Sequence, residues 1–174
     1  MLKPRQPVPP LEVDTLGGQT WKLAEQEPDS FTMVVFYRGL HCPQCSRYLK
    51  GLADQLGAFE ERGVGVIAIS CDSRERAEET PAKWALDGLK IGYGLTIDRA
   101  RDWGLYISNS RGMTSAGIEE TRQFNEPGLF LVRPDGTLYW AAVQSVPFAR
   151  PHFDEVLSAI DFVKSKDYPA RGEA

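Results

Sequence analysis

The chain has 174 residues, of which 42% are hydrophobic and 10% aromatic, enough apolar material for the core of one globular domain over residues 1–174. This composition excludes a disordered or fibrous chain. The 20 Lys and Arg residues against 24 Asp and Glu residues give a net charge of −4, and the basic residues are scattered, so we expect no nucleic-acid partner.

The apolar runs of the chain are far too short to span a bilayer. The first ten residues also lack the apolar core of a secretory signal. We therefore expect a soluble, cytoplasmic protein with no membrane partner.

The N-terminal half alternates strand and helix signals. Prolines predict an extended arm, the Gly17-Gly18 pair predicts a turn, and continuous apolar runs with β-branched residues predict buried parallel strands. Apolar residues that recur every three or four positions predict helices, and Pro81 predicts a break in the second of them. In chain order we expect an arm over residues 1–10, strands over 11–16, 20–23 and 32–37, a helix from Pro43 to about Gly63, a strand over 64–70 and a helix from 72 to about 85.

The C-terminal half continues this alternation and closes with a hairpin and a helix. The turn Arg133-Pro134-Asp135-Gly136 between two apolar segments is the clearest hairpin signal in the chain. The expected elements are a strand over residues 95–97, a helix over 99–105, an irregular insertion over 107–124, strands over 128–132 and 137–143, a helix over 152–164 and a tail over 165–174. This pattern indicates an α/β fold with a central mixed β-sheet and helices on both faces.

Two of the three cysteines stand where a strand gives way to a helix. Cys42 and Cys45 are separated by two residues, which is not the pattern of a disulfide-stapled secreted domain. Unpaired N–H groups and the positive end of the helix dipole favour a thiolate at a helix start. We expect Cys42 at the N-cap, Pro43 at the first helical position, and Cys42 as the more exposed sulfur of a dithiol that can form a disulfide.

Three neighbouring residues have more than one interpretation. Arg38 and His41 could add positive charge beside the Cys42 thiolate and lower its pKa, although His41 could equally be a loop residue that covers the sulfurs without an acid–base role. Cys71 ends the second apolar strand, where a buried small residue is favoured over a third redox thiol.

A Cys-x-x-Cys pair can also be half of a zinc site or two inert core residues. The other candidate zinc ligands are His41, Cys71 and His152, and they form no second paired motif. Ser46 follows the second cysteine, which excludes attachment of a c-type haem. We therefore favour a redox dithiol and expect no metal and no cofactor.

With these residues in place, the chain resembles the AhpC/TSA family, the peroxiredoxin-like proteins of the thioredoxin-fold superfamily. The resemblance covers about residues 7–164 and rests on residues 11–23, 33–45, 66–73, 95–98 and 127–136. It implies a thioredoxin-like fold and a thiol-dependent antioxidant oxidoreductase.

The chain departs from that family at the residues that build its peroxide pocket. Peroxiredoxins place a Pro seven residues and a Thr or Ser three residues before the peroxidatic Cys, and counting back from Cys45 these positions hold Arg38 and Cys42. The family's peroxide-binding Arg falls at Pro127. Cys42 and Pro127 resemble thioredoxin features instead, and we expect a cis bond before Pro127.

The resemblance implies a peroxiredoxin-like peroxidase first, with two alternative functions. In a peroxidase, Cys45 attacks a hydroperoxide and Cys42 resolves the sulfenic acid. In a disulfide reductase, Cys42 attacks a protein disulfide, Cys45 resolves it, and Pro127 shapes the docking edge. The third is a non-catalytic redox-sensing or binding module that uses residues 107–124. The expected partners are a hydroperoxide or protein disulfide and a thiol electron donor such as thioredoxin or glutathione, with an oligomer left open.

Overall fold

The structure, a computed structural model, describes residues 2–174. The strands are β1 (Glu12–Thr15), β2 (Thr20–Lys22), β3 (Phe31–Phe36), β4 (Val64–Ile69), β5 (Ile91–Tyr93), β6 (Ile107–Asn109), β7 (Gln123–Asn125), β8 (Gly128–Val132) and β9 (Leu138–Val143). The helices are α1 (Pro43–Ala53), α2 (Leu56–Glu60), α3 (Arg74–Trp84), α4 (Ile97–Asp102) and α5 (Phe153–Lys166), with a short 3₁₀ helix, η1 (Leu23–Glu25).

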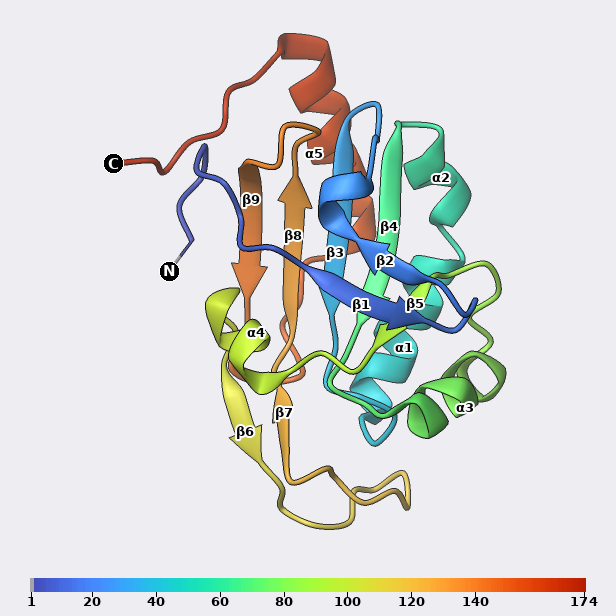
Figure 1. Cartoon of the computed structure of the whole chain (residues 1–174). Coiled ribbons are helices and arrows are strands. Elements are labelled where there is room, and N and C mark those ends of the chain that lie inside the picture. The colour runs from blue at the N-terminus through green and yellow to red at the C-terminus, as the bar shows by residue number, and fades with distance from the viewer. Residues whose placement is uncertain (1) are drawn as a thin grey trace.

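Within residues 2–174, seven strands form one mixed sheet in the order β2-β1-β5-β4-β3-β8-β9, while β6 and β7 form a separate arm (Figure 1). The central strand β3 pairs in parallel with β4 and antiparallel with β8. All six residues of β3 are buried, as expected for a strand covered on both faces. The chain leaves the end of β3 toward Cys42, which places the cysteines at this end of the sheet.

Two hydrophobic cores cover the two faces of the sheet, which confirms the predicted α/β architecture. Successive side chains of a strand point to opposite faces, so Met33 and Val35 enter one core. Val34 and Phe36 enter the other. The first core receives side chains from α1, α2, α3 and α5, and the second receives them from α4 and β2.

Two predicted helices differ from those observed. The expected continuous helix up to Gly63 is two helices, because Gln55 leaves the helical conformation with φ −114° and ψ 7°. Pro81 does not break the second helix but lies in the last turn of α3, which ends at Ala85 in the left-handed conformation. Pro81 has no N–H to donate, but its carbonyl accepts the N–H groups of Ala85 and Leu86, which close the helix at this point.

The strand expected over residues 95–97 lies instead at β5, and the reason is a helix cap. The Thr96 hydroxyl accepts a hydrogen bond from the N–H of Arg99 at 3.2 Å, so Thr96 begins α4 rather than continuing a strand. The segment expected to be irregular, residues 107–124, contains β6 and most of β7, which pair antiparallel. Its polar sequence hid this pairing, since neither strand has a buried face of the usual alternating kind.

The proline-rich arm and the C-terminal tail both lie against β9 or the turn before it. The N–H of Arg5 donates to the carbonyl of Leu138, and the N–H of Leu138 donates to the carbonyl of Gln6. The Arg5 side chain donates to the carbonyl of Ala170 at 2.9 Å, which ties the tail to the arm. One end of the edge strand is therefore covered by the chain's own termini.

Candidate active site

The two cysteines occupy the first turn of α1. Cys42 is the N-cap in an extended conformation, Pro43 is the first helical residue, and the Cys42 Sγ accepts a hydrogen bond from the backbone N–H of Cys45 at 3.3 Å. The local geometry is the one predicted from the sequence. Both sulfurs are free thiols in this structure.

Neither sulfur is open to solvent, although Cys42 is by a small margin the more exposed of the two, as expected. Cys42 is 1% exposed and Cys45 0% exposed. Both side chains belong to the hydrophobic core on the α1 face of the sheet, against which Ile118 and Tyr48 also pack. The loop before α1 folds inward, and later segments of the chain cover it.

The pKa values of the two thiols are shifted in opposite directions. A hydrogen bond from the Cys45 side chain, its backbone N–H, and the charges of Arg38 and Arg150 outweigh burial and lower the pKa of Cys42 to about 6. Burial and the neighbouring Cys42 raise the pKa of Cys45 well above its ordinary value. At neutral pH the pair therefore holds one thiolate, on Cys42, and one proton, on Cys45.

Arg150 is a site residue that the sequence analysis missed. Its Nη2 donates to the Cys45 Sγ at 3.0 Å, and its guanidinium carbon lies 4.7 Å from the centre of the Tyr48 ring. The Tyr48 hydroxyl donates to the carbonyl of Pro151 at 2.8 Å, which holds the Arg150 loop against α1. Among the described residues Arg150 has no carboxylate partner, and its Nε and Nη1 are buried without a hydrogen bond. Its charge is thus directed at the sulfurs.

Arg38 brings a second positive charge to the site. Its side chain forms buried ion pairs with Glu126 at 3.3 Å and Glu120 at 3.4 Å, and it lies 4.8 Å from the centre of the Phe124 ring. All three partners come from β7 and the residues next to it. Arg38 lowers the pKa of Cys42, although its own charge is largely matched by the two carboxylates.

His41 does not supply the positive charge that the sequence suggested. Burial, followed by the charges of Arg38 and Arg76, lowers the pKa of His41 to about 4, so the imidazole is neutral at pH 7. The ring is fully buried, lies 4.6 Å from the Phe124 ring, and has Nδ1 3.4 Å from Arg76 Nη2. The structure therefore favours the alternative in which His41 fills the loop beside the sulfurs.

A buried carboxylate fixes the loop between β3 and α1. The Asp72 carboxylate accepts the backbone N–H of Leu40 at 2.7 Å and Arg76 Nε at 2.9 Å. Gly39, one residue earlier, has φ +131°, a conformation that favours glycine. Gly39 also accepts the backbone N–H of Cys42 at 3.1 Å, so this loop sets the position of the N-cap thiol.

The structure corrects the prediction for Pro127. Residues 2–174 contain no cis peptide bond, so the bond before Pro127 is trans. The extended chain runs from β7 through Glu126 and Pro127 into β8, and the Pro127 carbonyl accepts the N–H of Gln144 at 3.0 Å, which prolongs the pairing of β8 with β9.

Cys71 is positioned as a structural residue. Its thiol donates to the Asn125 side-chain oxygen at 3.1 Å, and the Asn125 amide donates to the carbonyl of Tyr37 at 3.1 Å. Burial raises the pKa of Cys71 to about 11, which keeps the thiol protonated. This chain of contacts joins the end of β3 to β7 and favours the structural interpretation over a third redox thiol.

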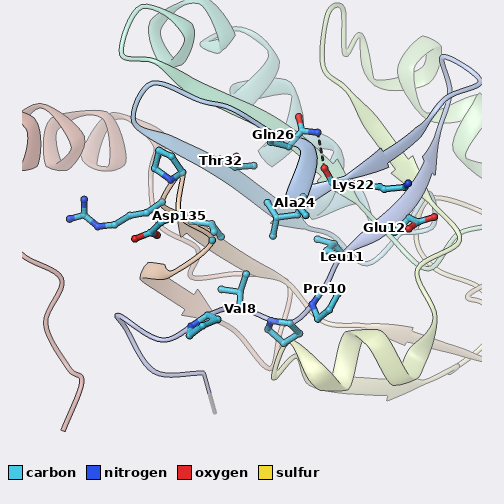
Figure 2. Close-up of a pocket in the computed structure, with 16 residues that line it drawn as sticks. Val8, Pro10, Leu11, Glu12, Lys22, Ala24, Gln26, Thr32 and Asp135 are labelled. Atoms are coloured by element: carbon cyan, nitrogen blue, oxygen red, sulfur yellow. Dashed lines mark hydrogen bonds between the residues drawn. The ribbon is translucent and has the colours of Figure 1, made fainter.

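One cavity lies next to the cysteine site and another lies away from it. A groove of about 310 Å³ lies beside Arg150 and is lined by Gln44, Arg47, Tyr48, Pro147, Phe148, Ala149, Arg150 and His152. A second cavity, of about 440 Å³, lies between the N-terminal arm and the β8–β9 turn, with Val8, Leu11 and Asp135 around it (Figure 2). The second cavity includes Thr32, at the opposite end of β3 from the cysteines, so it is separate from the dithiol.

Two further features concern metal binding and membrane insertion within residues 2–174. No group of three or more His, Cys, Asp or Glu residues in that range could hold a metal ion. None of the helices described there is long and apolar enough to cross a membrane.

Comparison with known proteins gives one family and a set of related sequences. Residues 4–141 match the model of the AhpC/TSA family. The chain is 29% identical to a 1-Cys peroxiredoxin from Medicago truncatula over 88% of this chain and 69% of that protein. It is 28% identical to 1-Cys peroxiredoxin B from Oryza sativa subsp. indica, where the match covers 55% of this chain and 44% of the rice protein.

Solved structures share the fold at low sequence identity. Peroxidoxin BcpB from Mycobacterium tuberculosis superposes with a TM-score of 0.72 at 17% identity, covering 94% of this chain and 99% of that chain. The arrangement of mixed sheet and flanking helices is therefore the one found in that protein.

Proposed function

The chain belongs to the AhpC/TSA family, and from this premise we propose that it is a thiol-dependent peroxidase whose Cys42 and Cys45 cycle between dithiol and disulfide. Its thioredoxin-like α/β fold and its similarity to 1-Cys peroxiredoxins support a hydroperoxide as the substrate. The observation that carries the proposal is one helix start that holds both sulfurs, where Cys42 Sγ accepts the N–H of Cys45 and Arg150 donates to Cys45 Sγ. A thiolate is the form of cysteine that attacks a peroxide.

The site's electrostatics support Cys42 as the sulfur that reacts first. The family alignment gives Cys45 the peroxidatic position, but its pKa is raised by burial and by Cys42. Cys42 has a pKa of about 6 and is the sulfur that is nucleophilic at pH 7. We therefore assign the first attack to Cys42, which reverses the order implied by the resemblance.

In the first step the Cys42 thiolate attacks the terminal oxygen of the hydroperoxide. The new S–O bond forms as the O–O bond breaks, so the sulfur is oxidised to sulfenic acid and the peroxide is reduced to an alcohol or, for H₂O₂, to water. The leaving oxygen takes the proton of the Cys45 thiol. Arg150, 3.0 Å from the Cys45 Sγ, stabilises the thiolate that this proton transfer leaves behind.

In the second step the Cys45 thiolate attacks the sulfenic sulfur of Cys42. The S–S bond forms, the S–O bond breaks, and the oxygen leaves as hydroxide, which becomes water on protonation. Two equivalents of an external thiol then reduce the disulfide and restore the dithiol by exchange. Arg150 thus acts on the resolving sulfur, while the backbone N–H of Cys45 acts on the attacking one.

Stopped-flow reaction of the fully reduced protein with H₂O₂ tests the proposal. We expect a rate constant at least about 100-fold above that of free cysteine, because the thiolate of Cys42 is preformed in a positively charged site. Mass spectrometry should show one Cys42–Cys45 disulfide for each peroxide consumed. If the protein were oxidised only as fast as free cysteine, the proposed peroxidase function would be wrong.

The same distribution of protons favours a second candidate, a thiol–disulfide oxidoreductase. There Cys42 attacks a substrate disulfide, and Cys45 then displaces the reduced substrate from the mixed disulfide. Reduction of insulin in the presence of dithiothreitol measures this activity. We expect it to be slow under conditions in which peroxide is consumed rapidly, and the opposite ranking would make disulfide reduction the main activity.

The pH profile of alkylation reports the state of Cys42 directly. Because the thiolate reacts with iodoacetamide and the thiol does not, the rate at Cys42 should rise with pH around a midpoint of about 6. In Cys45→Ala the midpoint should move upward, since the hydrogen bond from the Cys45 side chain is the largest contribution that lowers the pKa. Peptide mapping assigns the label to Cys42, and a wild-type midpoint near that of free cysteine would contradict the assignment.

A further inference from the structure

The arm formed by β6 and β7 reaches the loop that precedes Cys42. Figure 1 shows the arm projecting beyond the end of the sheet at which α1 begins. The connection between its strands turns back in a tight hairpin over residues 113–119, closed by a bridge between Met113 and Glu119 and by the N–H of Thr114 bonding to the carbonyl of Ile118 at 3.1 Å. We call residues 113–119 the hairpin tip.

The tip and the residue that follows it contact the active-site loop directly. The Thr114 hydroxyl lies 2.8 Å from the carbonyl oxygen of His41, one residue before Cys42, and 3.0 Å from that of Ile118, so its single proton is shared between the loop and the tip. Glu120, immediately after the tip, pairs with Arg38 at 3.4 Å, and both side chains are largely buried. The loop is therefore attached to the arm by a hydrogen bond on one side and an ion pair on the other.

Apolar contacts close the same interface. The Phe124 ring lies against His41, and the tip residue Ile118 packs on the core cluster that contains Leu40, Cys42 and Cys45. Met113, in contrast, is 67% exposed, so the outer face of the tip is open to solvent. The tip and β7 therefore contact the loop at His41, the residue before Cys42, while Met113 on the tip is exposed.

We propose that the hairpin tip determines substrate size by covering Cys42, so that the closed form admits a small hydroperoxide and excludes a protein disulfide. This inference rests on the proposed peroxidase function and names its substrate class. Hydrogen peroxide has two heavy atoms to bring to a sulfur that is 1% exposed. A protein disulfide must bring both of its sulfurs into line with Cys42 Sγ together with its flanking backbone, which requires the loop to be uncovered.

Thr114→Val removes the tether while nearly preserving the shape of the side chain. Thr121→Val is the matched control, because the Thr121 hydroxyl is exposed and bonds to Gln123 within the arm at 3.2 Å. Thr114→Ser keeps the hydroxyl and should restore wild-type behaviour. The loss of one hydrogen bond should increase about fivefold the population of molecules in which the tip has moved away from the loop.

Two labels of different size measure the cover in the full-length reduced protein. Rates of Cys42 modification by iodoacetamide and by a polyethylene-glycol maleimide are followed by mass spectrometry. Thr114→Val should raise the ratio of the maleimide rate to the iodoacetamide rate about fivefold, while Thr121→Val and Thr114→Ser leave it unchanged. An unchanged ratio in Thr114→Val, or the same increase in Thr121→Val, would overturn the cover.

Activity assays separate this inference from the peroxidase proposal. Thr114→Val should gain insulin reduction about fivefold while its rate with H₂O₂ stays within about twofold of wild type. A gain in insulin reduction without any fast reaction of the wild-type protein with H₂O₂ would retain the cover but overturn its role in a peroxidase. No gain in insulin reduction, with peroxide oxidation intact, would overturn the cover alone.

Discussion

Replacement of Cys42 by serine is expected to slow the reaction with H₂O₂ on the order of 100-fold or more, because it removes the sulfur that is deprotonated at neutral pH. Cys45→Ser should retain the first step at a lower rate, because it removes the thiol that protonates the leaving oxygen, while the Cys42 thiolate still accepts the backbone N–H of residue 45 and remains near the charges of Arg38 and Arg150. Sulfenic acid should then accumulate on Cys42, because the resolving thiol is absent. Stopped-flow rates and trapping of the sulfenic acid by mass measure both effects.

Cys71→Ser is the control for this pair of variants. Its thiol has a pKa of about 11 and takes no part in the mechanism, so the rate with H₂O₂ should match that of wild type. The informative contrary result is fast oxidation that survives in Cys42→Ser with sulfenic acid on Cys45. That result would place the first attack where the family alignment places it, and Arg150 would then act on the attacking sulfur.

The start of α1 illustrates what the sequence could predict. The N-cap position of Cys42 and the first helical position of Pro43 follow from local rules that depend on a few neighbouring residues. The buried strands β3 and β4 and the β8–β9 hairpin were also predictable, because each is a continuous apolar run of strand length. Local signals of this kind are therefore enough to predict most of the strands and helices.

The charges around the sulfurs could not be predicted in the same way. Arg150 reaches Cys45 across 105 residues of sequence, and its loop has no pattern that marks it. The charge of His41 depends on burial and on two nearby arginines, which a sequence does not reveal. The arm was missed for a related reason, since its contacts with the active-site loop involve single polar residues such as Thr114 and Glu120 rather than a periodic apolar face.

Gly39→Ala is expected to destabilise the folded protein by about 3 kcal/mol, since an alanine there combines backbone strain with a steric clash. Gly39 has φ +131°, and a Cβ would lie 2.7 and 2.9 Å from the two carboxylate oxygens of Asp72. Asp72 cannot move aside easily because the N–H of Leu40 and the side chain of Arg76 hold it. Urea unfolding should therefore show a much lower midpoint.

Gly104→Ala separates the strain of a positive φ from the clash. Gly104 has φ +74° and open space where a Cβ would be, so its replacement should cost only about 1 kcal/mol. The Gly39→Ala protein that remains folded should also alkylate more slowly at Cys42 near pH 6, because displacement of the loop disturbs the hydrogen bond from Cys42 N–H to the Gly39 carbonyl and with it the N-cap. Equal losses of stability in the two variants would show that Asp72 yields, and that the carboxylate does not fix the loop on which the thiolate depends.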